Sequence, residues 1–304
     1  MSILKVLTSV GLAALTFTAL HGEKRCPGNV PSVPLRQVQG ALIVVSLTVN
    51  GVGPFDFMVD TGAQITTVDE QLGAKLGLKT DGSTGVSGVA SFGRKAFTRL
   101  GQMEIDGHRV EDVLAVIDNL AQLQAADGRI RGIVGEDFLA HFDLLIDNDR
   151  RMLCLDETGA MAAAMKGSHL ALVQPYGADR DLPFTRPLVV EAHFEGNRDA
   201  VLFRLDSGSN APLMYGQRGS ARRSIPANAR TLKRVVEGVE QDFAILQPQD
   251  IALGGEKIRQ VTFVQPMNSV GTLREPREDG LLPTALFQRA FVSYRGGFAI
   301  LEPR

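Results

Sequence analysis

Several residue types on which specialised sites depend are scarce or absent in this sequence. Tryptophan is missing and only three tyrosines occur. This argues against a glycosidase, because an enzyme that cleaves sugars with two carboxyl groups also needs surfaces on which the sugars stack. Two cysteines are too few for a cysteine-built metal site, and the five histidines show no spacing typical of metal ligands. We therefore predict neither a metal nor a cofactor.

A strong excess of charge of one sign is also lacking. The formal net charge is only −2 for 304 residues. Overall electrostatics therefore give no reason to expect a nucleic acid or an anionic membrane surface as a partner. The chain is nevertheless long enough for one large or two ordinary domains with a sizeable core.

Long apolar runs are confined to the N-terminus. Lys5 is followed by an apolar stretch over residues 6–20, and a basic start before such a stretch is typical of a secretory signal peptide. We predict that residues 1–25 are this signal peptide and that the protein is exported, either to the periplasm or out of the cell. Because no clear small-residue cleavage site precedes Cys26, an uncleaved N-terminal membrane anchor is the alternative.

The two cysteines are Cys26 and Cys154. In an exported protein they could form one disulfide that ties the N-terminal segment to the first half of the chain. A bridge depends on the separation of their Cα atoms, which the sequence does not reveal. Two unpaired cysteines are therefore an equally good interpretation.

Many short apolar runs separated by glycine, asparagine and aspartate predict a mostly β protein. Two such runs, residues 57–59 and 202–205, each end in an aspartate, a small hydroxyl residue and a glycine. These triplets are Asp60-Thr61-Gly62 and Asp206-Ser207-Gly208. A carboxylate at the end of a buried strand is costly to desolvate unless it is hydrogen-bonded or has a chemical task. The two aspartates are therefore candidates for one shared site, and the alternative is that each only caps its own turn.

An apolar segment follows each aspartate at nearly the same distance. In the first half it ends at Gly135, 75 positions after Asp60; in the second half it ends at Pro283, 77 positions after Asp206. This recurrence predicts an internal duplication into two similar lobes. The predicted division is an N-terminal lobe over residues 26–158, an interlobe linker over 159–184 and a C-terminal lobe over 185–304.

The duplicated strand–Asp–Thr/Ser–Gly pattern resembles the aspartic proteases of the pepsin and retropepsin type over residues 41–301. The resemblance implies a mostly β fold of two similar retropepsin-like β-barrel lobes, related by a pseudo-twofold axis in a pepsin-like bilobal arrangement. Together with the predicted signal peptide, it indicates a bacterial, exported member of that group. We expect a monomer, since one chain supplies both aspartates.

For the chemistry, the resemblance implies an aspartic-type endopeptidase that acts on peptides or proteins. Asp60 and Asp206 match the two catalytic aspartates, which share a proton and activate a water between them for attack on a peptide bond. No metal or covalent intermediate is needed. The residues that match supporting positions around this pair are Thr61, Gly62, Ser207, Gly208 and Ser209.

The family also has a hairpin that moves to cover the cleft. The candidate residues for it are Gly85, Val86, Ser87 and Gly88. This segment lacks the tyrosine typical of pepsins, Pro283 takes the place of an expected glycine, and the matching region of the second lobe, residues 236–240, is short and acidic. These departures leave a second function open, in which a protease-like scaffold binds peptides or a partner protein without cutting them.

Overall fold

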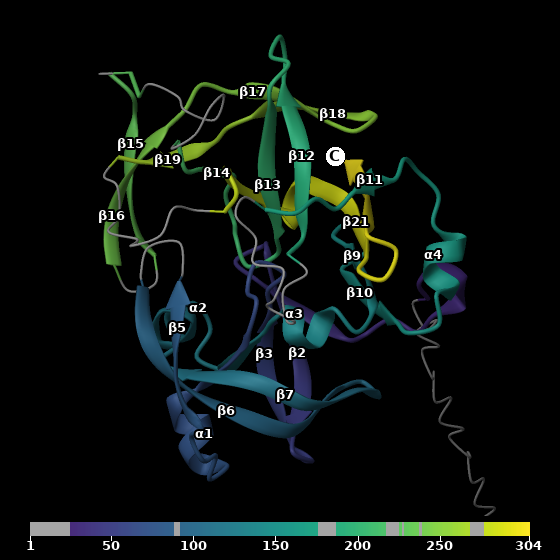
Figure 1. The fold of residues 1–304 in the computed structure, drawn as a ribbon, viewed down its shortest axis with the longest axis vertical. Helices are drawn as coiled ribbons and strands as arrows, with labels where there is room; N and C mark the ends of the chain where they lie inside the picture. Colours follow the sequence, from purple (N-terminus) through teal and green to yellow (C-terminus); the bar gives the residue numbers. More distant parts are fainter. Residues whose placement is uncertain are drawn as a thin grey trace, which may run out of the picture.

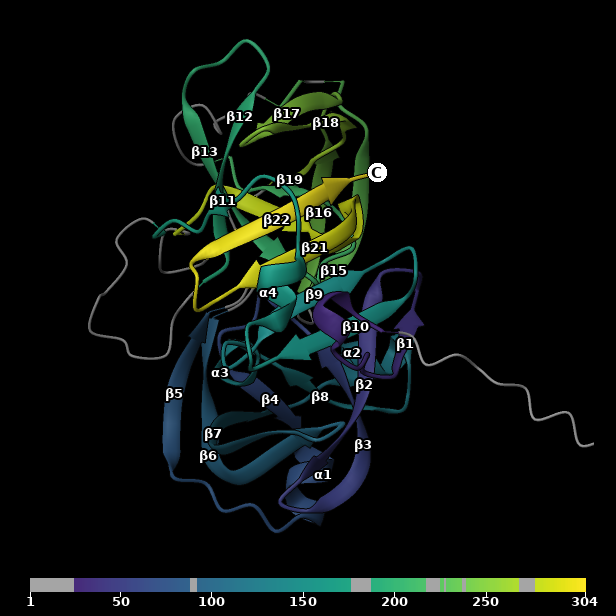
Figure 2. The ribbon, with the colours of Figure 1, turned by 90° about the vertical axis from the view of Figure 1, so that its right-hand side faces the viewer.

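The computed structural model describes residues 25–87, 92–175, 187–216, 225–226, 228–236, 239–267 and 277–304. Strands dominate these residues, so the prediction of a mostly β protein is confirmed. They form two large sheets, in the lower and upper parts of Figure 1, and a smaller sheet that lies between them in Figure 2. The predicted signal peptide, except for Arg25, lies outside the described residues. None of the helices in the described ranges is long and apolar enough to cross a membrane.

The first half of the chain forms an eight-stranded sheet in the order β1-β2-β3-β8-β4-β7-β6-β5. The hairpin of β2 and β3 turns at Asn50 and Gly51, whose φ angles of 51° and 74° are the positive values that a tight turn between twisted strands requires. Asparagine and glycine tolerate this conformation best, so a local signal sets the start of β3. The strands are β1 (Leu35–Val38), β2 (Leu42–Val49), β3 (Val52–Val59), β4 (Thr66–Asp69), β5 (Gly82–Ser87), β6 (Phe92–Ile105), β7 (His108–Asp118) and β8 (Ile130–Val134), with helices α1 (Glu70–Lys75), α2 (Ala121–Ala126) and α3 (Glu136–Leu139) between or after them.

The second half forms a nine-stranded sheet in the order β15-β16-β19-β14-β20-β13-β12-β17-β18. Its central pairings repeat those of the first sheet. β13 lies parallel to β20 as β3 lies parallel to β8, while β14 is antiparallel to β20 and parallel to β19 as β4 is to β8 and β7. The strands are β12 (Val189–Phe194), β13 (Ala200–Asp206), β14 (Leu213–Met214), β15 (Thr231–Val236), β16 (Val239–Ile245), β17 (Gln249–Leu253), β18 (Glu256–Val261), β19 (Val264–Pro266) and β20 (Gly280–Pro283).

A phenylalanine packs over a glycine at the centre of each large sheet. Phe57 pairs with Gly132, and Phe203 pairs with Gly280. A Cβ atom on Gly132 would lie 2.0 Å from the ring of Phe57, and one on Gly280 would lie 3.0 Å from the ring of Phe203. Only glycine leaves room for these rings, which are fully buried.

The third sheet joins the two halves. Its order is β10-β9-β21-β22-β11, and its central pair consists of β9 from the first half and β21 from the second, in antiparallel register. One continuous apolar core includes buried residues of both halves. The strands are β9 (Asp143–Asp147), β10 (Met152–Asp156), β11 (Leu170–Ala171), β21 (Phe287–Ser293) and β22 (Phe298–Pro303), and the 3₁₀ helix η3 (Thr284–Leu286) precedes β21.

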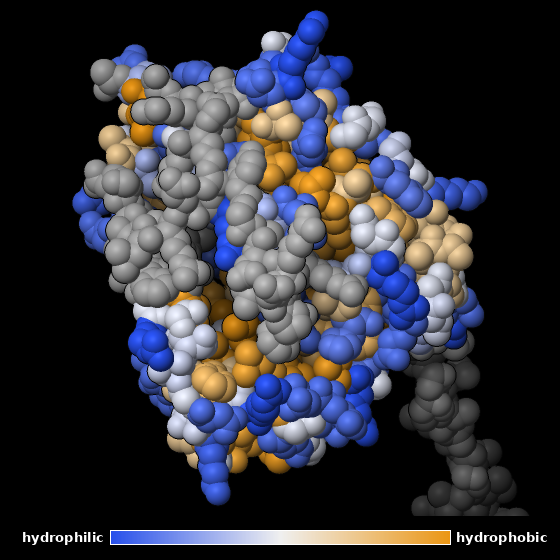
Figure 3. Space-filling view, in the orientation of Figure 1, coloured by the Kyte–Doolittle hydropathy of each residue, from blue (hydrophilic) through white to orange (hydrophobic). Residues whose placement is uncertain are grey.

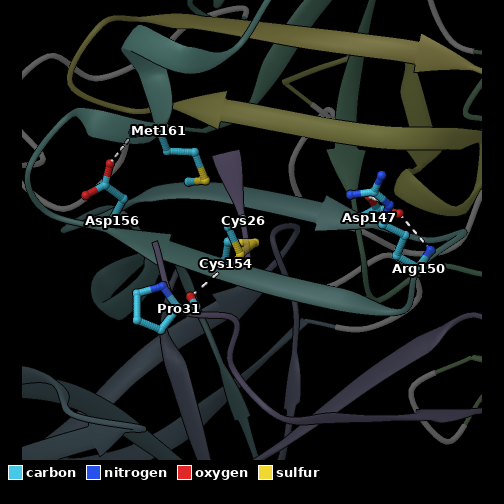
Figure 4. The surroundings of a disulfide bond; sticks show 7 residues. All are labelled: Cys26, Pro31, Asp147, Arg150, Cys154, Asp156 and Met161. Carbon is cyan, nitrogen blue, oxygen red and sulfur yellow. Dashed lines mark hydrogen bonds and ion pairs between the residues drawn. A yellow bond between two sulfur atoms is a disulfide. The ribbon is translucent and has the colours of Figure 1, made fainter. Parts of the chain in front are cut away.

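A disulfide between Cys26 and Cys154 settles the choice that the sequence left open. The Cα atoms are 6.2 Å apart, and the bridge ties the N-terminal segment with its 3₁₀ helix η1 (Pro27–Asn29) to β10 (Figure 4). Nearby, Asp156 accepts a 2.7 Å hydrogen bond from the backbone N–H of Met161, which holds α4 (Ala160–Ala164) against this sheet. Helix α4 and β11 thus occupy the described part of the predicted linker.

Candidate active site

The two aspartate-bearing turns lie against each other and are joined by reciprocal hydrogen bonds. The backbone N–H of Thr61 donates to Ser207 Oγ and that of Ser207 donates to Thr61 Oγ1, each at 3.0 Å. In return, Thr61 Oγ1 donates to the carbonyl of Leu205 at 2.8 Å, and Ser207 Oγ donates to that of Val59 at 2.9 Å. Both hydroxyl residues are buried, so water does not compete for these bonds and they fix the relative position of the turns.

This arrangement brings the carboxyl groups of Asp60 and Asp206 together. Asp60 Oδ1 accepts hydrogen bonds from the backbone N–H groups of Gly62 at 2.7 Å and Ala63 at 3.2 Å. Asp206 Oδ1 accepts one from Gly208 at 2.7 Å. The two carboxyl groups also lie close enough that each affects the pKa of the other. Because two ionised carboxylates at such close range repel each other, the pair is favoured to hold one proton.

Each glycine of the triplets packs on the carboxyl group of the opposite turn. A Cβ atom on Gly62 would lie 2.7 Å from Asp206 Cγ, and one on Gly208 would lie 2.5 Å from Asp60 Cγ. Such contacts are far shorter than van der Waals separation. Any larger residue at either glycine would therefore push the carboxyl groups apart.

Burial raises the pKa of both aspartates, and the two rises are unequal. Burial and then the charge of Asp60 raise the pKa of Asp206 well above its usual value. Burial also raises the pKa of Asp60, but its two backbone N–H donors and Arg204 oppose this rise. Because Asp60 accepts two backbone N–H bonds and Asp206 only one, the single proton of the pair is favoured on Asp206. In the described ranges, no group of three or more histidine, cysteine, aspartate or glutamate side chains is arranged to hold a metal ion.

Ser209 lies next to the pair but bonds within its own loop. Its Oγ donates to the carbonyl of Ala211 at 3.0 Å and accepts from the N–H of the same residue at 3.5 Å. The resemblance to the pepsin type implies a supporting role for Ser209 beside Asp206. The structure places its hydroxyl instead in a local turn bond, because the chain bends back immediately after the serine.

The predicted covering segment forms part of a hairpin. Gly85, Val86 and Ser87 lie in the second half of β5, which pairs antiparallel with β6, while Gly88 lies outside the described residues. In Figure 1 this hairpin points from the lower half toward the upper half. Figure 3 shows apolar side chains, in orange, on the same face between the two halves.

A second hairpin, made of β15 and β16, approaches from the upper half on the same side of the molecule (Figure 1). It contains described members of the region predicted to match the first hairpin, residues 236–240. The amide Nε2 of Gln122 in α2 donates to the carbonyl of Val235 at 2.6 Å. This hairpin therefore contacts the first half of the chain directly.

Pro283 does stand where the first half has a glycine, and the surrounding loop has changed with it. In the first half, the N–H of Gly135 donates to Thr66 Oγ1 at 3.2 Å, and that hydroxyl donates to Asp137 at 2.7 Å. Six positions after Asp206, where the first half has Thr66, the second half has Pro212. The second half thus lacks both the N–H donor and the hydroxyl that would accept its hydrogen bond, so Pro283 leaves neither group without a partner at this position.

Three buried charged residues close to the pair were not predicted. Arg204 donates from Nε to Glu278 Oε1 at 3.1 Å and from Nη1 to the carbonyl of Gly62 at 3.3 Å. Glu136, fully buried, accepts a 3.2 Å bond from the N–H of Leu188. An arginine inside the apolar run 202–205 is a visible signal in the sequence, but nothing local identifies its partner, because Glu278 is 74 positions away.

The match to a family model lies in the first half of the chain. Residues 45–138 match the family model described as aspartyl protease. Among solved structures, a retropepsin-like aspartic protease from Rickettsia conorii matches at 21% sequence identity. That match covers 41% of this chain and 90% of the other, with a TM-score of 0.31. No curated protein matches the chain. Residues 45–138, which contain Asp60, are therefore similar to the aspartyl proteases.

Proposed function

We propose that this chain is an aspartic-type endopeptidase in which Asp60 and Asp206 form the catalytic pair. The observation that carries the proposal is the meeting of the two carboxyl groups, which the reciprocal bonds of Thr61 and Ser207 hold in place. The family match over residues 45–138 supports the same reaction class. Turn-capping aspartates do not need such a lock, nor do they need to approach each other against their mutual repulsion.

The proposed reaction uses one water and the single proton of the pair. Ionised Asp60 takes a proton from the water, and the water oxygen attacks the carbonyl carbon of the peptide bond. At the same time Asp206 gives its proton to the carbonyl oxygen. The resulting gem-diol has two hydroxyl groups, and the proton now rests on Asp60. Asp60 then protonates the departing nitrogen, the C–N bond breaks, and Asp206 recovers a proton from one hydroxyl. Both carboxyl groups return to their starting state.

We further propose that the two halves are similar lobes related by a pseudo-twofold axis, as in a pepsin-like bilobal enzyme. The repeated order of strand pairing and the central β9–β21 pair support this arrangement. A single chain would then be active as a monomer on peptide or protein substrates. Specific activity that does not change on dilution would agree with a monomer, whereas loss of activity on dilution would indicate a required dimer.

Export is the proposal for location, with residues 1–25 as a signal peptide or, alternatively, an uncleaved anchor. The disulfide between Cys26 and Cys154 supports export, since such bridges persist mainly in oxidising compartments. The mass of the protein recovered from the periplasm or medium separates cleavage from retention. Recovery of the whole protein in a reduced state from the cytoplasm would refute export.

The function is tested by digesting a mixed peptide library with the wild type, Asp60→Asn and Asp206→Asn. We expect cleavage by the wild type, inhibited by a statine-type transition-state analogue, and loss of at least about 10³-fold in kcat in either variant, because each removes one proton carrier. Near-ultraviolet circular dichroism establishes that the variants are folded. Equal cleavage by all three proteins would refute the catalytic pair, and peptide binding without cleavage by the wild type would favour the alternative of a non-catalytic binding module.

A further inference from the structure

We propose that Arg204 is a positioning residue for the carboxyl pair. It reaches the pair through the backbone of the opposite turn and keeps the pair in the state that holds one proton. This inference rests on the proposed peptidase function. It concerns a residue on the strand that carries Asp206, two positions before that aspartate. Its side chain points away from the solvent and is 8% exposed.

The geometry connects Arg204 to Asp60 through one peptide group. Arg204 Nη1 donates to the carbonyl of Gly62 at 3.3 Å, and the N–H of Gly62 donates to Asp60 Oδ1 at 2.7 Å. A cation bonded to the carbonyl of this turn holds the turn in place. It also provides positive charge close to the carboxylate that must stay ionised.

The equivalent position of the first half holds no cation, which separates this role from a general requirement of the fold. Two positions before Asp60 stands Met58, buried in an apolar cluster with neighbours such as Leu42 and Ile130. The fold therefore accepts a methionine at the strand position that is equivalent to Arg204. Burying an arginine instead costs several kcal/mol in desolvation unless a partner compensates, and Glu278 is that partner, at 3.1 Å and 3.4 Å.

The charged and titratable groups around Arg204 determine the sign of its effect. Burial by itself lowers the pKa of Arg204, but Glu278 and then Glu136 oppose this and raise it above the usual value, so the guanidinium stays protonated. Arg204 in turn lowers the pKa of both Asp60 and Asp206, against the effect of burial. The groups that face this cluster from the elements packed on it are Asp60 and Gly62 after β3, Glu136 of α3, Asp206 of β13, Tyr215 after β14, Glu278 before β20 and Tyr294 after β21.

Removing the cation should therefore raise the pKa values of the pair. In Arg204→Met, the residue that the first half uses, we expect both limbs of the pH profile of kcat/KM to move upward by about one pH unit or more. The double variant Arg204→Met with Glu278→Gln should show a smaller upward shift, because the anion that opposes Arg204 is removed as well, and it leaves no buried unpaired carboxylate. Glu278→Gln alone should move the profile downward, because Arg204 then acts on the pair without its counter-ion.

A conservative variant separates charge from geometry. Arg204→Lys keeps the cation but has no planar fork to bond Glu278 and Gly62 together. We expect a lower kcat with a profile close to that of the wild type. Arg99→Met removes an arginine whose side chain is 50% exposed and is the matched control; neither kcat nor the profile should change.

The shift in the pKa values of the pair can also be measured without following peptide cleavage. Titration of the aspartate carboxyl ¹³C resonances, assigned with Asp60→Asn and Asp206→Asn, reports the pKa values of the pair in each folded variant. Values and pH profiles that do not move in the folded double variant would refute the inference. A wild type that cleaves no peptide would refute the proposed function instead, and an upward shift of the pair in the carbon titration would still support the role of Arg204.

Discussion

Glu136 provides a sharp test of the electrostatics behind the carboxyl pair. It is the first residue of α3, directly after Gly135, and it is fully buried. One oxygen accepts a bond from the N–H of Leu188 at 3.2 Å, and Oε2 has no hydrogen-bond partner. Burial raises the pKa of Glu136 to about 8, against a usual value of 4.5; Arg204 opposes the rise and Asp60 adds to it.

The sign of the pH effect follows from where the proton is held. Between pH 4.5 and about 8, Glu136 is neutral in the folded protein and ionised in the unfolded chain, so unfolding releases a proton. The stability that Glu136 contributes is therefore greatest below pH 4.5 and is lost as the pH rises toward 8. At about 1.4 kcal/mol per pH unit, the loss amounts to about 3 kcal/mol between pH 5 and pH 7.5.

Glu136→Gln should abolish this loss. Glutamine keeps the shape of the side chain and an oxygen for the N–H of Leu188, but it has no proton to release. We expect the free energies of unfolding of wild type and variant to be similar at pH 5, and the variant to be more stable by about 3 kcal/mol at pH 7.5. Titrations of the aspartate pair occur in both proteins and largely cancel in the difference.

The measurement is urea unfolding followed by circular dichroism at half-unit steps from pH 5 to pH 7.5. Glu111→Gln, which replaces an exposed glutamate on β7, is the control and should run parallel to the wild type. If Glu136→Gln also runs parallel to the wild type, Glu136 is ionised in the folded protein. The account of a neutral carboxyl behind the pair would then be wrong.

Two further predictions concern packing and the disulfide. Gly208→Ala places a Cβ atom 2.5 Å from Asp60 Cγ and should lower kcat by about 100-fold or more, whereas Gly128→Ala, at an exposed site with no atom closer than 3.8 Å, should not change peptide cleavage. Replacing Cys26 and Cys154 by serine should lower the free energy of unfolding by about 2–4 kcal/mol, because the bridge closes a loop across 128 positions. Unchanged urea midpoints would show that the bridge adds no stability.

The sequence predicted those features that depend on short segments. The turn at Asn50 and Gly51 follows from residue types that accept positive φ. The triplets that begin at Asp60 and Asp206 carry their signal within a few residues, and their matching downstream segments at Gly135 and Pro283 are visible from spacing alone. These patterns were enough to foresee a mostly β chain and the meeting of two turns.

Features that depend on contacts between distant residues could not be read in this way. The pairing of Arg204 with Glu278 joins residues 74 positions apart, and neither residue has a local pattern that selects the other. The disulfide depends on a Cα separation that only the folded chain defines. Ser209 fits the expected pattern in sequence, yet its hydroxyl bonds Ala211, because the path of the following backbone decides its direction.

The differences between the two turns also explain why the carboxyl groups should not be equivalent. If two identical turns met, neither aspartate would be favoured to hold the shared proton. Here Asp60 receives two backbone N–H bonds, from Gly62 and Ala63, and Asp206 receives one, from Gly208. Donors to a carboxylate stabilise its charge, so the ionised form is favoured at Asp60.

The loops behind the turns reinforce this asymmetry. Asp60 adjoins a polar network of Thr66, Gly135 and Asp137, whereas the matching loop beside Asp206 contains Pro212 and Pro283, which have no N–H to donate. With fewer N–H donors, this loop does less to stabilise a negative charge on Asp206. Pro212 and Pro283 therefore favour a proton on Asp206. Peptide hydrolysis requires two distinct roles, a base that activates the water and an acid that donates a proton, and the two unequal carboxyl groups match them.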